Sequence, residues 1–135
     1  MTVETYLHKV QYYETDQMGI VHHSNYVRWM EEARIDFLAR IGWDYKSMED
    51  RGIFSSVTAV ECRYKVSARF GDVVTVAVAV EEFRGVKLKL RYRMTRGDDL
   101  LCEGRSEHCF LNREGKIISL KRDYPVLYEA LQPEE

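Results

Sequence analysis

The stretch "YYETDQMGIVHHSNYVRWMEEAR", residues 12–34, joins one acidic turn, a glycine and two adjacent histidines to an amphipathic pattern. That pattern runs on to residue 41, with apolar side chains at three- and four-residue steps: Val27, Met30, Ala33, Phe37, Leu38 and Ile41. The spacing predicts a helix over 24–41 with one apolar face. We expect Ser24 or Asn25 to cap its start, and Gly42 suits its end.

The segments around this helix favour strands. Residues 5–13 are aromatic and β-prone, and residues 14–23 are expected to form a loop with Gly19 as its flexible point. A polar connector follows the helix, and the apolar period then changes to two, which predicts strands over 54–68, 72–85, 86–98, 100–112 and 117–120. Turn signals lie at 83–85, 96–99 and 113–116, and a last helix is expected over 123–131, with Pro125 in its first turn. This order predicts an α+β fold, an antiparallel sheet with a long helix on one face.

Composition excludes several classes of protein. The 135 residues suit one domain with its own core, and 45% apolar with 31% charged residues is an ordinary globular balance. A net charge of -2 gives no support to nucleic acid as a partner, and no apolar run is long enough to span a membrane. Three cysteines without metal-type spacing favour a reducing compartment, so we expect a cytoplasmic protein: Cys62, Cys102 and Cys109.

Asp16 is the first candidate for chemistry. An aspartate in a loop usually caps a turn, but here the start of a long helix follows within a few residues. The first amide groups of a helix lack internal partners and carry partial positive charge, so they can polarise a carbonyl. A carboxylate facing that point could attack the carbonyl carbon or activate a water. Acyl transfer would then need no serine or cysteine nucleophile.

The histidine pair follows Asp16 at the predicted helix start. The backbone N–H of His23 could stabilise an oxyanion while its ring contacts a substrate, or the residue could simply be a surface histidine. Because His22 and His23 are adjacent, we expect their side chains to diverge, and no metal site is expected. Tyr12 could pack in the core or lend its hydroxyl to the site.

Other polar residues have structural interpretations that we favour. Glu31 and Glu32 lie on the helix, and Glu31 is expected to pair with Arg34 or Arg28 rather than act in catalysis. His108 and Glu107 are neighbours on a strand and should face opposite sides of the sheet.

A basic stripe accompanies the strand predicted over 86–98. Its apolar residues should face the core: Leu88, Leu90, Tyr92 and Met94. Its cations should face outward: Lys87, Lys89, Arg91 and Arg93. This stripe is interpreted as a solvated face, with attraction of a phosphorylated ligand as the alternative.

The residues around Asp16 also form a motif. Its members are Tyr12, "ETD" at 14–16, Gly19, Ile20, Val21, His22, His23, Tyr26 and "EEAR" at 31–34, with "ARFGD" at 68–72 further on. The motif resembles the signature of hotdog-fold acyl-CoA thioesterases, in the branch of 4-hydroxybenzoyl-CoA and Tol-Pal-associated thioesterases. His22 departs from it, since Tyr or Trp is frequent there, and so does Glu14, where Asp is common in one branch.

The resemblance implies a single hotdog thioesterase domain over 1–135, with a long central helix wrapped by an antiparallel sheet. It implies a homodimer or homotetramer with active sites at the subunit interface, an acyl-CoA substrate, and no cofactor. Carried over by position, the catalytic residues are Asp16, His23 and Tyr12. The substrate-binding residues are then Gly19, Ile20, Val21, His22 and Tyr26.

Hydrolysis of an acyl-CoA or aryl-CoA thioester is therefore the leading functional hypothesis. A dehydratase or hydratase on the same fold is one alternative, although those enzymes usually use a histidine and an acid in different motifs. A module that binds acyl-CoA without turnover is the other alternative, and an intact Asp16 argues against it.

Overall fold

The structure is a computed structural model that describes residues 4–133. Its strands are β1 (Glu4–Lys9), β2 (Phe54–Tyr64), β3 (Val73–Phe83), β4 (Lys87–Arg96), β5 (Asp99–Leu111) and β6 (Ile117–Ile118). Its helices are α1 (Ser24–Arg40), α2 (Tyr45–Asp50), α3 (Leu120–Asp123) and α4 (Pro125–Ala130), with a 3₁₀ turn, η1, at Tyr12–Glu14. No helix within this range is long and apolar enough to cross a membrane.

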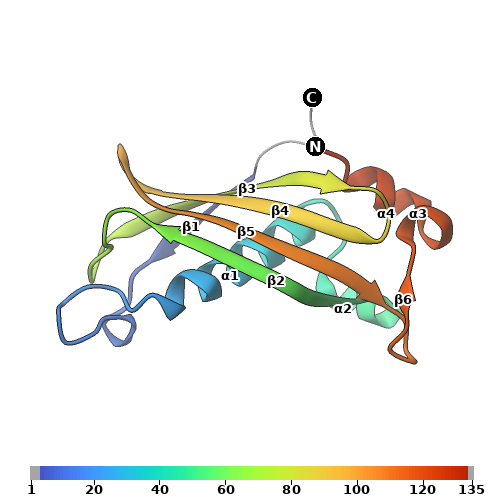
Figure 1. Ribbon diagram of the computed structural model, residues 1–135, viewed down its shortest axis with the longest axis horizontal. Helices are drawn as coiled ribbons and strands as arrows, with labels where there is room; N and C mark the ends of the chain where they lie inside the picture. Colours follow the sequence, from blue (N-terminus) through green and yellow to red (C-terminus); the bar gives the residue numbers. More distant parts are fainter. Residues whose placement is uncertain (1–3, 134–135) are drawn as a thin grey trace.

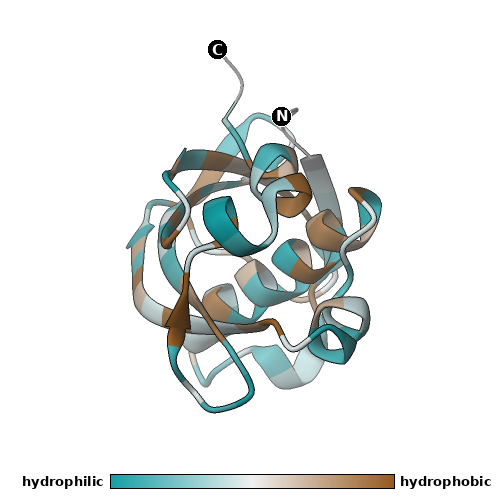
Figure 2. Cartoon of the chain, turned by 90° about the vertical axis from the view of Figure 1, so that its right-hand side faces the viewer, coloured by the Kyte–Doolittle hydropathy of each residue, from teal (hydrophilic) through white to brown (hydrophobic). Residues whose placement is uncertain are grey.

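The strands form one antiparallel sheet in the order β1-β3-β4-β5-β2, with β6 paired to the far end of β5. Helix α1 lies along one face of this sheet (Figure 1). Figure 2 looks from the end that carries α3 and α4, and the sheet curves around α1. The expected α+β arrangement is confirmed, and it is the hotdog fold that the resemblance implies.

The sheet and the helix share one core because their apolar periods face each other. The four apolar residues predicted to face inward on β4 are all buried: Leu88, Leu90, Tyr92 and Met94. Gly104 on β5 brings the helix close, since a Cβ there would lie 3.1 Å from the sulfur of Met30. A larger residue at 104 would therefore require the end of the Met30 side chain to shift, so glycine allows this close approach without repacking.

The helix predicted over 24–41 is confirmed as α1, which ends one residue earlier than predicted. Gly42 follows it with φ of 87°, a left-handed conformation that glycine adopts without strain. Most of the predicted apolar face is buried, but Val27 is not, with 39% of its surface exposed.

Several elements differ from their predicted bounds. The strand predicted over 54–68 ends at Tyr64, and the strand predicted over 117–120 covers only Ile117–Ile118. The strand predicted over 5–13 ends at Lys9, because residues 12–14 turn into η1 and the Glu14 carboxylate accepts a hydrogen bond from Gln11 N–H. The terminal helix predicted over 123–131 is α4, and the short helix α3 precedes it, with a break at Tyr124 (φ -141°, ψ 66°) immediately before Pro125. The residue before a proline disfavours helical geometry, and the proline then begins α4 at its first position.

A buried polar network lies where α1 meets the sheet. The Arg34 guanidinium donates to the hydroxyls of Tyr45 and Tyr92, each at 3.1 Å. Tyr92 is hydrogen-bonded to Ser106 Oγ at 2.7 Å, and Ser106 Oγ lies 2.7 Å from His108 Nε2. Neutral hydroxyl groups therefore surround the buried cation where a carboxylate would be usual.

The ion pairs expected for Glu31 are wrong. Within residues 4–133, Glu31 pairs with neither Arg28 nor Arg34, because Arg34 turns inward to the tyrosines. Glu32 instead accepts a hydrogen bond from the Tyr6 hydroxyl at 3.2 Å. The opposite orientation of His108 and Glu107 is confirmed, since His108 is buried and Glu107 approaches Lys87 and Lys89 on the outer face.

Burial, with the nearby charge of Arg34, lowers the pKa of His108 to about 3. The neutral ring is therefore the native form. An unfolded histidine titrates near pH 6.5, so between that pH and about 3 the unfolded chain binds one more proton than the folded chain. The contribution of His108 to the free energy of unfolding is therefore largest above about pH 6.5, and it falls as the pH decreases below that value.

We expect His108→Gln, which cannot titrate, to show a weaker pH dependence of unfolding than the wild type. Urea unfolding between pH 7 and pH 5 avoids the range in which most carboxylates titrate. The wild type should lose roughly 1 kcal/mol of unfolding free energy per pH unit below about pH 6, relative to the variant. Parallel curves for the two proteins would contradict this assignment.

Candidate active site

Asp16 lies in a tight turn that its own backbone closes. Asp16 N–H donates to the Ile20 carbonyl at 2.8 Å, and Gly19 N–H donates to the Asp16 carbonyl at 3.0 Å. Gly19 has φ of 77°, which this turn requires and glycine permits. The side chain contributes too, because Asp16 Oδ1 accepts from Met18 N–H at 2.8 Å. Asp16 Oδ2 receives no hydrogen bond from any residue within 4–133, so one carboxylate oxygen remains available.

The start of α1 provides the second half of the site. His23 occupies the N-cap position, and Ser24 N–H donates to the ring Nδ1 of His22 at 3.2 Å. The predicted caps, Ser24 and Asn25, are therefore wrong, since His23 is the N-cap residue and the ring of His22 accepts from the first helical amide. The N–H of His23 finds no acceptor among the described residues. It is the free amide that an oxyanion site at this helix start needs.

The prediction that the side chains of His22 and His23 diverge is wrong. The rings of His22 and His23 are stacked, with centroids 4.3 Å apart and planes inclined by 30°. Tyr64, at the end of β2, faces His23 with ring centroids 6.2 Å apart, and its hydroxyl donates to the His23 carbonyl at 3.3 Å. Sequence reasoning did not identify Tyr64, because 41 residues separate it from His23.

Glu14 joins the Asp16 turn to the helix start. Its backbone carbonyl accepts from His22 N–H and from the Asn25 side chain, each at 2.9 Å. One residue further along, Thr15 and Val21 form an antiparallel bridge. The structure therefore places the turn and the first residues of α1 side by side, as the site hypothesis requires.

The Glu14 side chain is almost fully buried, with 4% of its surface exposed. Its carboxylate accepts from Gln11 N–H and His8 Nε2, each at 2.8 Å, and from Trp29 Nε1 at 2.6 Å. Burial acts to raise the pKa of Glu14, but these three hydrogen bonds outweigh it and hold the pKa below its ordinary value. Glu14 is thus an ionised carboxylate satisfied inside the protein.

The loop before β3 supports the same region. Val21 N–H donates to the Ala68 carbonyl at 2.9 Å, and Ala68 N–H donates to the Tyr26 hydroxyl at 3.2 Å. Val21 and Tyr26 are buried by these contacts. In Figure 1 this loop and residues 10–22 lie at one end of the sheet, opposite α3 and α4.

Tyr12 lies outside the core. Its side chain is 76% exposed, and its ring meets the edge of Phe70 with centroids 5.7 Å apart. Tyr12 therefore belongs to the turn η1 rather than to a strand, beside the loop that carries Ala68. Of the other expected substrate-binding residues, Ile20 is half-buried, and Gly19 and His22 are exposed.

The basic stripe on β4 faces outward as expected, but most of its charges are paired. Lys89 approaches Glu82 at 3.3 Å, and Arg93 approaches Glu103 at 3.8 Å. Arg91 stands opposite Arg105 and has no carboxylate within 4 Å among residues 4–133. These contacts favour the solvated-face interpretation.

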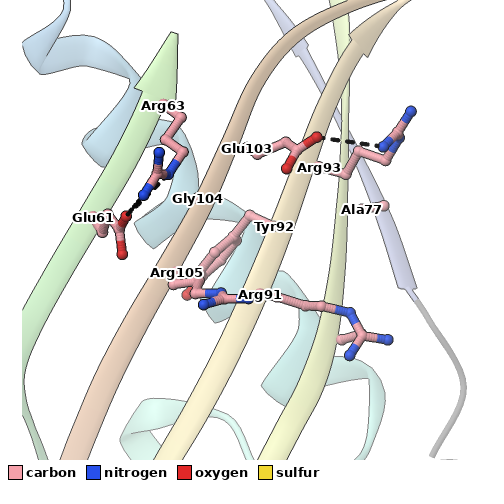
Figure 3. A pocket seen from close by; sticks show the side chains of 10 residues that line it. Glu61, Arg63, Ala77, Arg91, Tyr92, Arg93, Glu103, Gly104 and Arg105 are labelled. Atoms are coloured by element: carbon pink, nitrogen blue, oxygen red, sulfur yellow. Dashed lines mark hydrogen bonds and ion pairs between the residues drawn. The ribbon is translucent and has the colours of Figure 1, made fainter.

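A pocket of about 540 Å³ lies on this outer face, away from Asp16 and His23. Figure 3 shows arginines and glutamates around it, with Gly104 beneath. Its charged lining is Glu61, Arg63, Arg91, Arg93, Glu103 and Arg105. No residue of the sequence motif lines this hollow, so it is separate from the candidate active site.

Comparison with known proteins agrees with this geometry. Residues 10–131 match the model of the thioesterase-like superfamily. A crystal structure of DHNA-CoA thioesterase from Staphylococcus aureus is 32% identical with a TM-score of 0.91, covering 96% of this chain and 89% of that one. A hypothetical protein from Thermus thermophilus is 39% identical with a TM-score of 0.86, covering 94% and 95%.

Among curated relatives, an acyl-CoA thioesterase of Haemophilus influenzae, YbgC, is 27% identical over 94 residues, covering 69% of each chain. The motif around Asp16, the wrapped helix and these similarities agree with one another. The chain belongs to the thioesterase-like superfamily and has its hotdog fold.

Proposed function

We propose that this chain hydrolyses an acyl-CoA or aryl-CoA thioester to the free acid and CoA. Membership of the thioesterase-like superfamily supports thioester hydrolysis as the reaction class. One geometric observation carries the assignment of the site. A free oxygen of Asp16 and a free amide of His23 belong to segments that the Glu14 carbonyl ties together.

In the proposed reaction, the thioester carbonyl accepts a hydrogen bond from His23 N–H at the positive end of α1. Asp16 then acts in one of two ways. As nucleophile, it forms a mixed anhydride and releases the CoA thiolate, and water hydrolyses the anhydride. As general base, it takes a proton from the attacking water, and the thiolate leaves with that proton. Both routes end in the acid and CoA.

The remaining motif residues have supporting roles in this proposal. Gly19, Ile20 and His22 line the approach to Asp16, while Tyr12 presents its exposed hydroxyl beside the same turn. Val21 and Tyr26 form the buried wall behind it, with the Tyr26 hydroxyl held by Ala68 N–H.

We also propose that residues 1–135 form one domain and that the protein belongs to the branch of 4-hydroxybenzoyl-CoA and Tol-Pal-associated thioesterases. We propose that it acts in the cytoplasm, where its cysteines stay free.

We expect the wild-type chain to release free CoA from at least one member of a panel of short-chain, long-chain and aryl CoA esters. A thiol-trapping assay measures the release. A change at the acyl double bond without release of thiol would support a dehydratase or hydratase. Saturable binding without either change would support the binding module, and each of these results would contradict the proposal.

Asp16→Asn should lower kcat by roughly 10²–10⁴-fold, because the amide can neither attack the carbonyl nor accept a proton effectively. The fold and ligand affinity should persist, since the amide oxygen can still accept from Met18 N–H. Asp98→Asn is the matched control, as Asp98 is exposed in the turn between β4 and β5. Near-full activity of Asp16→Asn under saturating substrate would exclude Asp16 as the catalytic group.

We propose that the active protein is a homodimer or homotetramer whose contact includes β2. This 11-residue strand is at the edge of the sheet, and within residues 4–133 it pairs with β5 only. It leaves apolar side chains exposed beside the helix start, with Val60 46% and Tyr64 47% exposed. An unpaired, partly apolar edge favours addition of another strand.

Val60→Glu should therefore shift the sedimentation coefficient of the chain toward the monomer and reduce CoA release. The new charge would be buried without a partner at the contact. Val126→Glu is the control, because Val126 is 72% exposed on α4, at the other end of the molecule. A wild-type chain that sediments as a monomer at micromolar concentration would contradict the proposed assembly.

A further inference from the structure

We infer that Glu14 is a positioning residue for this reaction, holding Asp16 and the His23 amide at a fixed separation. The inference rests on the proposed function and adds to it a residue that contacts no substrate. Glu14 acts through both parts of the residue: its side chain is anchored in the core, and its backbone carbonyl holds the helix start.

The side-chain anchor comes from three different segments. Gln11 N–H belongs to the turn before η1, His8 Nε2 to β1, and Trp29 Nε1 to the second turn of α1. His8 is held in place in turn, since its ring lies 4.7 Å from the Trp29 ring and its Nδ1 is 3.4 Å from Glu32. Because hydrogen bonds to an ionised acceptor are short and directional, three of them fix the carboxylate firmly.

The backbone anchor extends this rigidity to the reacting groups. Glu14 is two residues before Asp16, and its carbonyl accepts from His22, the residue before His23. Asn25 adds a second donor to the same carbonyl and is itself buried. A shift of Glu14 would therefore move the carboxylate turn relative to the free amide.

Stability alone is a poor account of this arrangement. Taking a carboxylate out of water costs free energy that its hydrogen bonds only offset, and an apolar side chain of similar size often serves a core as well or better. What the carboxylate contributes is a unique geometry, since it specifies where Trp29, His8 and the chain at Gln11 must lie. Catalysis depends steeply on such geometry, and a displacement of about 1 Å costs on the order of 10²-fold in rate.

Glu14→Gln tests the inference with little change in volume. The amide nitrogen would face one of the three donors, which would loosen the loop without opening a cavity. We expect kcat to fall by about 10- to 100-fold with KM within about threefold of the wild type. Because the effect operates through Asp16, Glu14→Gln in the Asp16→Asn background should change the residual kcat by less than about twofold.

Trp29→Phe removes the indole donor, together with part of the ring volume at a fully buried position, and provides a second variant should Glu14→Gln fail to fold. Trp43→Phe is its matched control, since Trp43 lies past the far end of α1 under the Arg51 guanidinium. Trp29→Phe should lower kcat several-fold, and Trp43→Phe should leave it unchanged. In the Trp43→Phe background Trp29 is the sole tryptophan, so Glu14→Gln should also shift its fluorescence emission.

Two results would overturn the inference while the proposed function stands. One is full kcat in both Glu14→Gln and Trp29→Phe. The other is an equal fold-loss from Glu14→Gln with Asp16 present and absent, which is the result of a merely structural role. If the wild-type chain itself releases no CoA, the proposed function fails first, and the failure is visible before any variant is made.

Discussion

The hydrogen bond between the Trp29 indole and the buried Glu14 carboxylate is the contact on which the geometry of the candidate site depends. Residues 10–22 contain no long helix or strand, so they have no regular backbone ladder to define their course. The carboxylate supplies that definition by gathering donors from β1, the turn and α1. The chain can then approach the helix start closely without burying unsatisfied amides.

Helix α1 has a second polar anchor of opposite sign. Arg34 is buried among tyrosine hydroxyls, whereas Trp29 donates to a carboxylate, and the two side chains leave the helix on different sides. An apolar helix face alone tolerates small rotations and slides, because dispersion contacts are individually weak. Two directional anchors five residues apart remove that freedom. The helix start is consequently fixed both along and around its axis, as the proposed oxyanion site would require.

Local patterns in the sequence were sufficient to predict the order of the helices and strands and the antiparallel sheet. The three- to four-residue period predicted α1, and the alternation on β4 predicted its buried face. Residue types and spacing also led to the Asp16–His23 region as the proposed site, and this assignment stays a prediction. The predictions were wrong where long-range partners decide the outcome. Arg34 turns away from Glu31 because its partner Tyr92 lies 58 residues further along the chain. The burial of Glu14 was not predicted at all, since His8 and Trp29 approach it from other elements. Helix capping by a histidine ring was missed for a different reason, since serine and asparagine are the commoner caps and both follow directly.

The absence of a side chain at Gly104 has an evolutionary consequence. Because the end of the Met30 side chain lies against that position, a larger residue at 104 would change the packing between α1 and the sheet. Selection on this core position could thus alter the packing beneath the proposed site. Comparisons of homologues limited to the residues of the proposed site would overlook such a change.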